Sequence, residues 1–456
     1  MRRNEQDRAG RAPGVPNAPG AAAWLRLRTL PLALLGWAAA AGTAWADDGQ
    51  DDIANWLSFD YNIQALGYGT ATVLNRESLA NPGNRIAQVP QLKGEIDPRV
   101  DLTLKAGPCY AQLKPRGFFV WQGSTPGENP RTSTDAYLNE GRLSCRLEGV
   151  TAEVGRGVLL WGSSILLSPS NPFFAETGKI NPVNEILGRD FARLSAQVSP
   201  AWSVEAIGNF HVDTRDTTKA YFSPVTALKV NWTGDAASAS ALVSHRDDGV
   251  NRLGAYGTWT VSDALLLYGD GSLGQGRSAL FAVPQSGAPA GWTFAQNQTR
   301  DKSLRASALF GASYTVPSGW TGTLELLYNG DGYSSGERHA YQSAIQAANG
   351  ALAMGNVAAA GVLGQALNPQ QSLLGRRYAL LQVGRTDLFN KLDVTLRYTQ
   401  AFDAPRGGNA ALSLNYKITP NAELFAFAQW NVGNSQSEFV QVARFSMMSG
   451  LHYYWN

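Results

Sequence analysis

Residues 391–399 read KLDVTLRYT, and apolar and polar side chains alternate along the whole stretch. Leu392, Val394, Leu396 and Tyr398 fall on one face of an extended chain, and the charged and hydroxyl side chains between them fall on the other. A period of two residues predicts a β-strand. Because one face is apolar and the other is polar, the stretch suits a strand with lipid on one side and water on the other.

The same alternation recurs along the chain from residue 55 onward, as in GEIDPRVDLTLK at 94–105 and NAALSLNYKI at 409–418. Breaks in the pattern divide it into eighteen predicted strands. They lie near residues 55–69, 93–107, 109–122, 134–147, 149–159, 189–199, 200–213, 217–232, 235–248, 249–262, 263–275, 302–316, 319–332, 374–390, 391–402, 406–419, 421–433 and 438–455.

The connections between these strands distinguish a membrane barrel from a soluble β-sandwich, whose strands also alternate. Every second connection is minimal, as at Gly107-Pro108, Ser199-Pro200 and Pro420-Asn421. The others are longer, and those near 160–188, 276–301 and 333–373 are the longest. Strict alternation of short and long connections over an even number of strands predicts an all-β, transmembrane antiparallel β-barrel with short periplasmic turns and long extracellular loops.

Composition supports this fold class. Only 16% of the 456 residues are charged, whereas soluble proteins average about 25%. No apolar run after the N-terminus approaches the roughly 20 residues of a membrane helix. Aromatic residues on the apolar face near the strand ends indicate two interfacial girdles. They are Trp202, Trp259, Trp320, Tyr328, Tyr416, Trp430, Tyr453 and Trp455.

The N-terminus has the features of a secretory signal peptide. A basic stretch precedes the apolar segment 30–41, and Ala44-Trp45-Ala46 fits a signal-peptidase site. We therefore expect residues 1–46 to be cleaved and residues 47–456 to form the barrel. Six arginines lie in the leader, so the mature chain is slightly acidic and its charge gives no reason to expect nucleic-acid binding.

Two enzyme-like strings lack the structural context that their chemistry needs. GDGSLG at 269–274 follows a strand but precedes no helix, and GYSSG at 332–336 lies among turn residues. The four histidines show no convergent catalytic pattern, and the cysteines and histidines have no metal-ligand spacing. We expect neither catalysis nor a cofactor.

The third predicted extracellular loop, residues 160–188, is too apolar to lie in water. Its large side chains need a buried environment, and the barrel interior is the one within reach besides lipid. We therefore expect the loop to fold inward, with Trp161, Asn171, Phe173 and Phe174 forming a constriction. A cap over the mouth, or an extension of the flanking strands, is the alternative. The uncharged stretch 340–375, which covers most of the loop 333–373, predicts a packed, partly helical loop.

Charged residues on the polar face of the strands would line the lumen. Bases exceed acids on that face, which predicts weak anion preference. The cluster expected to contact solute is Arg99, Asp101, Lys114, Arg116, Arg142, Arg146 and Arg193. Pairing of these bases with neighbouring acids into a stabilising ladder is the alternative. Arg156 breaks the alternation, which warns of a β-bulge.

The two cysteines fall opposite each other in one predicted hairpin. Cys109 begins a strand and Cys145 lies near the end of the next, on the same face. In the oxidising periplasm this pair predicts a disulfide.

The run VGRGVLLWG at 154–162, followed by SPSNPFF at 168–174 and INPVNEILGRDF at 180–191, resembles the Gly-Arg strand and Asn-Pro loop of outer-membrane porin-like barrels, including the alginate-export type. This resemblance implies passive transport of an anionic solute or polysaccharide across the Gram-negative outer membrane, without a cofactor. The expected partners are outer-membrane lipid, the solute and the barrel-assembly machinery, which would read the aromatic-rich end GLHYYWN. A barrel enzyme such as a lipid hydrolase, and a structural or adhesin barrel, are the competing functions.

Overall fold

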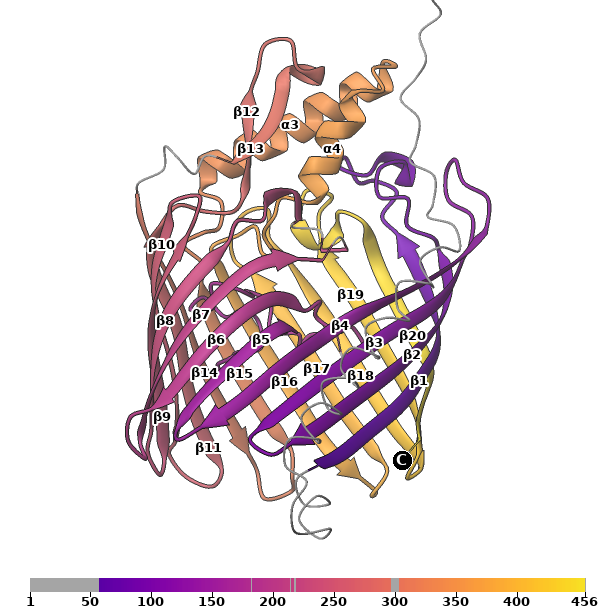
Figure 1. Ribbon diagram of the computed structural model, residues 1–456. Helices are drawn as coiled ribbons and strands as arrows, with labels where there is room; N and C mark the ends of the chain where they lie inside the picture. The colour runs from indigo at the N-terminus through magenta and orange to yellow at the C-terminus, as the bar shows by residue number, and fades with distance from the viewer. Residues whose placement is uncertain (1–56, 182, 214, 217–218, 297–302, 456) are drawn as a thin grey trace, which may run out of the picture. The chain divides into compact units, whose positions relative to one another are not determined.

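The chain folds into a closed antiparallel barrel. The computed structural model describes residues 57–181, 183–213, 215–216, 219–296 and 303–455. Eighteen strands form one sheet, and β1 (Leu57–Leu74) pairs with both β2 (Leu92–Ala106) and β20 (Ala443–Trp455), which closes the ring (Figure 1). Closure pairs the backbone groups of every strand on both sides, as a lipid environment requires.

The other barrel strands are β3 (Cys109–Gln122), β4 (Arg131–Leu147), β5 (Val150–Gly157), β6 (Arg189–Gln197), β7 (Trp202–Val212), β8 (Val225–Thr233), β9 (Ala237–Arg246), β10 (Val250–Thr260), β11 (Leu265–Gln275), β14 (Leu304–Thr315), β15 (Thr321–Tyr328), β16 (Arg377–Leu388), β17 (Leu392–Ala401), β18 (Gly407–Thr419) and β19 (Ala422–Gly433). The remaining elements are the hairpin strands β12 (Leu280–Pro284) and β13 (Trp292–Gln296), the helices α3 (Ser335–Ala353) and α4 (Ala359–Leu367), and the 3₁₀ turns η2 (Pro82–Asn84), η3 (Lys219–Tyr221), η4 (Pro289–Gly291) and η5 (Glu438–Val440).

The predicted strand count and order are confirmed, and the boundaries shift by up to eight residues, the largest shift being at the start of β8. β1 continues to Leu74, five residues beyond its predicted end. β8 and β20 begin later than predicted because η3 and η5 occupy the first part of each predicted segment. The signal peptide, residues 1–46, lies outside the described residues.

The connections at the periplasmic end are short, as predicted, but not every extracellular connection is long. Gly107 and Gly149 adopt φ of 54° and 86° in the two-residue turns β2–β3 and β4–β5, a conformation that glycine tolerates. At the other end, residues 247–249 join β9 to β10 in a tight turn that Gly249 closes with φ of 91°. The expectation of strict alternation was therefore wrong at this hairpin, since a glycine in the left-handed region permits a short loop there as well.

Residues 276–296 and 329–376, from two extracellular loops, form a small packed unit beyond the barrel rim (Figure 1). Its core joins Phe294 of the β12–β13 hairpin to Tyr341 of α3 and Leu363 of α4. Ser334 caps α3, and Glu337 completes the capping box. The predicted partly helical loop is confirmed, whereas the β12–β13 hairpin was not predicted. Among the described residues, no helix is both long enough and apolar enough to cross a membrane.

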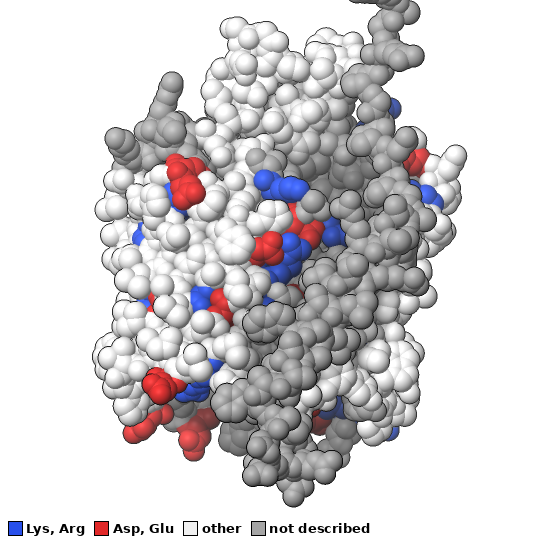
Figure 2. Space-filling view, viewed as in Figure 1, with Lys and Arg blue, Asp and Glu red and all other residues white. Residues whose placement is uncertain are grey.

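The outer wall is apolar, and the blue and red side chains in Figure 2 gather in a few patches on the face shown. Predicted girdle residues such as Trp202, Trp259 and Trp430 are 42–54% exposed on this wall. Arg156, which breaks the alternation, lies next to a bulge between β6 and β7 and forms ion pairs with Asp190 (2.6 Å) and Asp213 (2.5 Å).

Candidate functional site

The inward direction of a side chain follows from exposure along each strand. On β15, Glu325 is 0% exposed, whereas its neighbours Leu324 and Leu326 are 46% and 53% exposed. On β17, Arg397 is 8% exposed between Leu396 and Tyr398, which face outward. Glu325 and Arg397 therefore point into the barrel, and segments that contact them lie inside it.

The segment 158–188, called the third loop below, makes its first contacts with β6, β7 and β8. Leu159, Phe173 and Phe174 are at most 8% exposed and form a cluster with Phe191, Ile207, Val225 and Ala227. Burying large apolar side chains contributes roughly 1.5–3 kcal/mol each. This packing holds the beginning of the loop against the inner wall.

Two buried carboxylates on the wall then bind the backbone of the loop. Glu325 accepts hydrogen bonds from the amides of Ile165 (2.6 Å) and Leu166 (2.8 Å). Asp270 on β11 accepts from the Ser170 amide and the Ser168 hydroxyl, both at 2.7 Å. Hydrogen bonds to a charged acceptor are stronger than neutral ones, and here they offset the cost of burying each carboxylate.

Arg397 holds the next part of the loop as a hydrogen-bond donor, whereas the two carboxylates are acceptors. Its guanidinium donates to the carbonyl oxygens of Lys179 and Ile180, each at 3.0 Å. The Lys179 ammonium in turn donates to the carbonyls of Ser163 (3.1 Å) and Ser164 (3.0 Å), which braces two parts of the loop against each other.

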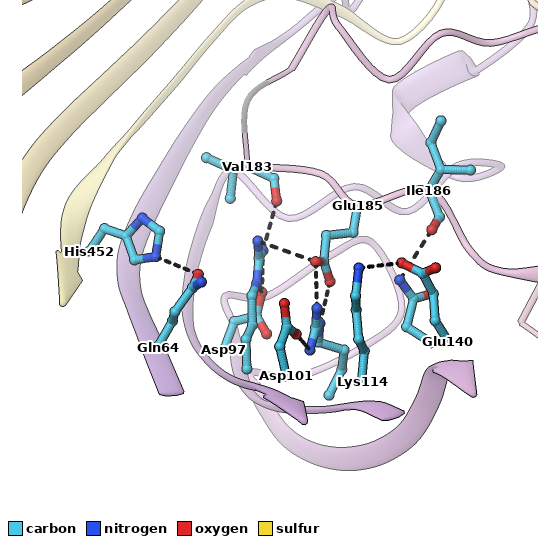
Figure 3. Close-up of polar contacts among 12 residues, drawn as sticks. Gln64, Asp97, Asp101, Lys114, Glu140, Val183, Glu185, Ile186 and His452 are labelled. Atoms are coloured by element: carbon cyan, nitrogen blue, oxygen red, sulfur yellow. Dashed lines mark hydrogen bonds and ion pairs between the residues drawn. The ribbon is translucent and has the colours of Figure 1, made fainter. Parts of the chain in front are cut away.

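The end of the loop attaches to β2, β3 and β4 (Figure 3). Arg99 donates to the Val183 carbonyl at 2.8 Å, and Arg116 binds both oxygens of Glu185, at 2.6 and 2.9 Å. Asn139 donates to the Ile186 carbonyl and accepts from the Gly188 amide. Burial alone would raise the pKa of Glu185, but the hydrogen bonds from Arg116 and the positive charges of Arg99 and Lys114 lower it.

These contacts follow one another around the inner wall, from β6–β8 through β11, β15 and β17 to β2, β3 and β4. The third loop is therefore an internal belt. Its exposed residues border the space that remains in the lumen. They are Leu160, Ala175, Glu176, Gly178, Lys179, Ile180, Asn184 and Glu185.

The predicted constriction residues lie in this belt but face the wall. Asn171 donates to the Leu159 carbonyl and accepts from the amides of Phe173 and Phe174. Trp161 stacks on Tyr256 of β10 and contacts the Lys229 ammonium at 4.6 Å from the ring centre. The burial of Asn171, Phe173 and Phe174 corrects the expectation that these side chains form the constriction: large apolar groups are stabilised by leaving water, so they anchor the loop.

The residues that border the lumen were missed by sequence reasoning. Glu176 and Lys179 are exposed there, and Glu176 also accepts a hydrogen bond from Ser372 of the loop that contains α3 and α4. The available signal was that they are among the few charges within an otherwise apolar segment.

The predicted lumen bases point inward, and most form ion pairs. Arg99 pairs with Asp97, Lys114 with Glu140, Arg116 with Asp101 and Glu185, Arg142 with Glu153, and Arg193 with Glu153 and Glu205, at 2.6–3.7 Å. Arg146 differs, because its side chain has no ion pair or hydrogen bond with any described residue. The geometry therefore favours the charge ladder over a row of free cations.

A disulfide joins Cys109 and Cys145, which are directly opposed in the β3–β4 register. Across the described ranges, no group of three or more His, Cys, Asp or Glu residues has an arrangement able to hold a metal ion.

Comparison with known proteins identifies the fold. No protein-family model matches the chain, and no curated protein matches it. Solved structures do: OpdK of Pseudomonas aeruginosa with vanillate (TM-score 0.53, 10% identity, covering 87% of this chain and 98% of that one), OccK7 (OpdD) of the same organism (0.51, 10%, 87% and 99%), and OccAB1 of Acinetobacter baumannii (0.51, 12%, 87% and 96%).

The chain has the fold of the Occ/OprD outer-membrane porins. This is an eighteen-stranded fold of the Gram-negative outer membrane. At 10–12% identity the likeness extends to the architecture, and no individual side chain is carried over.

Proposed function

We propose that the protein is an outer-membrane channel for small polar solutes, with a preference for anions. The observation that supports it is the combination of a closed eighteen-stranded barrel with an internal loop fixed to charged side chains of the inner wall. A barrel of this size encloses an aqueous path unless loops fill it. A belt along the wall narrows that path and leaves polar groups beside it.

The solute class is inferred from the groups beside the path. Lys179 is exposed in the belt, and Arg146 is exposed on the inner wall without a carboxylate partner among the described residues. Among the similar structures, OpdK was determined with vanillate, which is a small carboxylate. We infer that small organic anions are the preferred solutes.

Reconstitution in planar lipid bilayers tests the channel. We expect discrete, ohmic conductance steps and a reversal potential that indicates anion preference in a salt gradient. Deletion of residues 163–180 provides the internal comparison, because it removes the middle of the belt and should enlarge the steps. Absence of steps from protein that has folded, judged by heat-modifiable migration, would overturn the proposal.

The alginate-export resemblance leads to a finer alternative, in which the solute is an anionic polysaccharide. Its sequence support is the run 154–191, and most of that run is the belt. Uronic-acid oligomers of increasing length distinguish the two solutes. If oligomers longer than a few sugars block the conductance without passing, the small-solute proposal stands; if long oligomers pass into the receiving vesicle, export of polymer replaces it.

An enzymatic or adhesive barrel is the competing class of function. The four histidines lie on β7, β9, α3 and β20, so they belong to four separate elements. His211 contacts Asp190 and His245 contacts Asn251, whereas a hydrolase needs histidine beside a nucleophile. Assay of the purified protein for phospholipid hydrolysis separates an enzyme from a channel.

The proposed partners follow from the surface of the barrel. Outer-membrane lipid would cover the apolar wall, and the assembly machinery would recognise the terminal strand β20, in which Leu451, Tyr453 and Trp455 are 37–46% exposed.

A further inference from the structure

A cavity of about 370 Å³ opens on the inner wall at the periplasmic ends of β3, β4, β5 and β6. It is distinct from the belt, because the residues that line it belong to strands and to one periplasmic turn. The polar groups that matter for its chemistry are Tyr110, Ser144, Arg146, Thr151, Arg193 and Ser195.

Strand register places these side chains next to one another. Arg146 on β4 is opposite Thr151 on β5, and Thr151 is opposite Ser195 on β6. One row further along the strands, Tyr110 on β3 is opposite Ser144 on β4. Residues directly opposed across an antiparallel pair have Cβ atoms about 4.5–5.5 Å apart. The cavity therefore brings Arg146 together with hydroxyl groups from four strands.

The charge of the cavity is positive. Glu153 is its one acid, and that carboxylate lies 3.1 Å from Arg142 and 3.7 Å from Arg193. Glu205 forms an ion pair with Arg193 from the other side, at 3.0 Å. The Arg146 guanidinium has no such partner among the described residues and is exposed in the lumen. It is the group whose five donors remain available for a ligand.

We propose that this cavity is a binding site for a small oxyanion, a carboxylate or a phosphate group. Arg146 binds two of the oxygens, and the Ser144, Thr151 and Ser195 hydroxyls donate to the anion. A guanidinium matches such groups with two parallel hydrogen bonds, which a single ammonium does not. The inference rests on the proposed function and extends it, since it places a binding site for the transported solute on the periplasmic side of the belt.

The disulfide is a positioning device for the same site. Cys109 precedes Tyr110, and Cys145 precedes Arg146, while the Arg146 amide donates to the Pro108 carbonyl at 2.9 Å. The covalent link therefore fixes the register of the two strands at the point where they present Tyr110 and Arg146.

Binding to the purified full-length protein in detergent tests the site without requiring conduction. The probe is trifluoroacetate, followed by ¹⁹F NMR line broadening. We expect saturable broadening in the wild type and affinity reduced by at least about tenfold in Arg146→Ala, because the charge-assisted hydrogen bonds are lost. Arg146→Lys should retain part of the affinity. The control is Lys417→Ala, which removes a base from the periplasmic end of β18 where it pairs with Asp387, and which should bind as the wild type does.

Competition with inorganic phosphate distinguishes the two ligand chemistries: displacement at lower phosphate than acetate concentration assigns a phosphate site, and the reverse assigns a carboxylate site. Equal broadening in wild type and Arg146→Ala would overturn the proposal. Planar-bilayer recordings of the same samples keep the channel hypothesis separate. If the wild type conducts but binds no probe at Arg146, the site is wrong and the channel proposal stands; if it binds but does not conduct, the reverse holds.

Discussion

Single side chains decide where the belt lies. Glu325 accepts hydrogen bonds from two loop amides and from the Tyr268 hydroxyl (2.7 Å). Three donors therefore depend on one fully buried carboxylate. Gly254 on β10 has the opposite role, because a Cβ atom there would lie 2.9 Å from the Ser170 carbonyl oxygen. One residue attracts the loop and the other leaves room for it.

Replacement of Glu325 by alanine should release the belt while the barrel remains folded. The loop amides of Ile165 and Leu166 would lose their acceptor, at a cost of about 1–3 kcal/mol for each unsatisfied group. We expect larger and noisier conductance steps and faster proteolysis within residues 163–180. Glu205→Gln is the matched control, since Glu205 pairs with wall bases. Unchanged conductance and cleavage in Glu325→Ala would show that the other anchors suffice.

Gly254→Ala should displace the loop by steric contact. The added methyl group meets backbone atoms of Ser170, which have little freedom to move because Asp270 holds them. We expect a destabilisation of about 1–3 kcal/mol, typical of overpacking, measured as a lower urea midpoint. Gly322→Ala on β15, where the added atom has no neighbour within 4 Å, should leave the midpoint unchanged, and a matching loss there would remove the steric explanation.

Elements differ in what holds them. The strands are fixed by the closed ladder, and the β3–β4 pair also by its disulfide. The extracellular unit of α3, α4 and the β12–β13 hairpin depends on its own apolar core and on helix capping. These two kinds of support predict different responses to reduction and to acid.

Loss of the disulfide should weaken the barrel. A cross-link between residues 36 apart restricts the unfolded chain and contributes roughly 3–4 kcal/mol. We expect a lower urea midpoint for the Cys109→Ser, Cys145→Ser double variant and the same loss for wild type under reductant. If reductant lowers the midpoint of the double variant equally, the effect does not come from this bond.

Acidification should loosen the start of α3. Burial alone would raise the pKa of Glu337, but hydrogen bonds from Arg277 and the Ser334 amide lower it to about 2. A carboxyl with a lowered folded-state pKa stabilises the fold above its ordinary value of 4.5, and this contribution disappears as the pH falls toward 2. We expect the local stability of α3 to fall by about 1–2 kcal/mol in that pH range, measured as reduced protection of its amides in hydrogen exchange. In Glu337→Gln, the protection of the α3 amides should not fall over the same pH range.

For the whole molecule, the charge ladder makes selectivity depend on few groups. Most inward bases form ion pairs with adjacent acids, whereas the Lys179 ammonium donates to backbone carbonyls beside the path. A low-dielectric wall strengthens the field of such a charge on passing ions.

Lys179→Gln should therefore shift the reversal potential toward cation permeability, whereas Lys179→Arg should keep the wild-type value. The measurement is the reversal potential of each variant and of the wild type in a tenfold salt gradient. If both variants behave as the wild type does, the belt does not set the selectivity.

The sequence by itself determined the barrel. The period of two in stretches such as 391–399 fixes which face meets lipid, and the short turns between consecutive strands fix the strand order. It also placed Cys109 opposite Cys145, because both lie in one hairpin and follow from local register. The path of the third loop was decided by tertiary structure alone. Its anchors Asp270, Glu325 and Arg397 are 100 to 218 residues distant along the chain, and local pattern carries no information about such contacts. Its apolar residues indicated burial but not which side chains would face the wall, so Glu176 and Lys179 were recognised only once the barrel had closed around them.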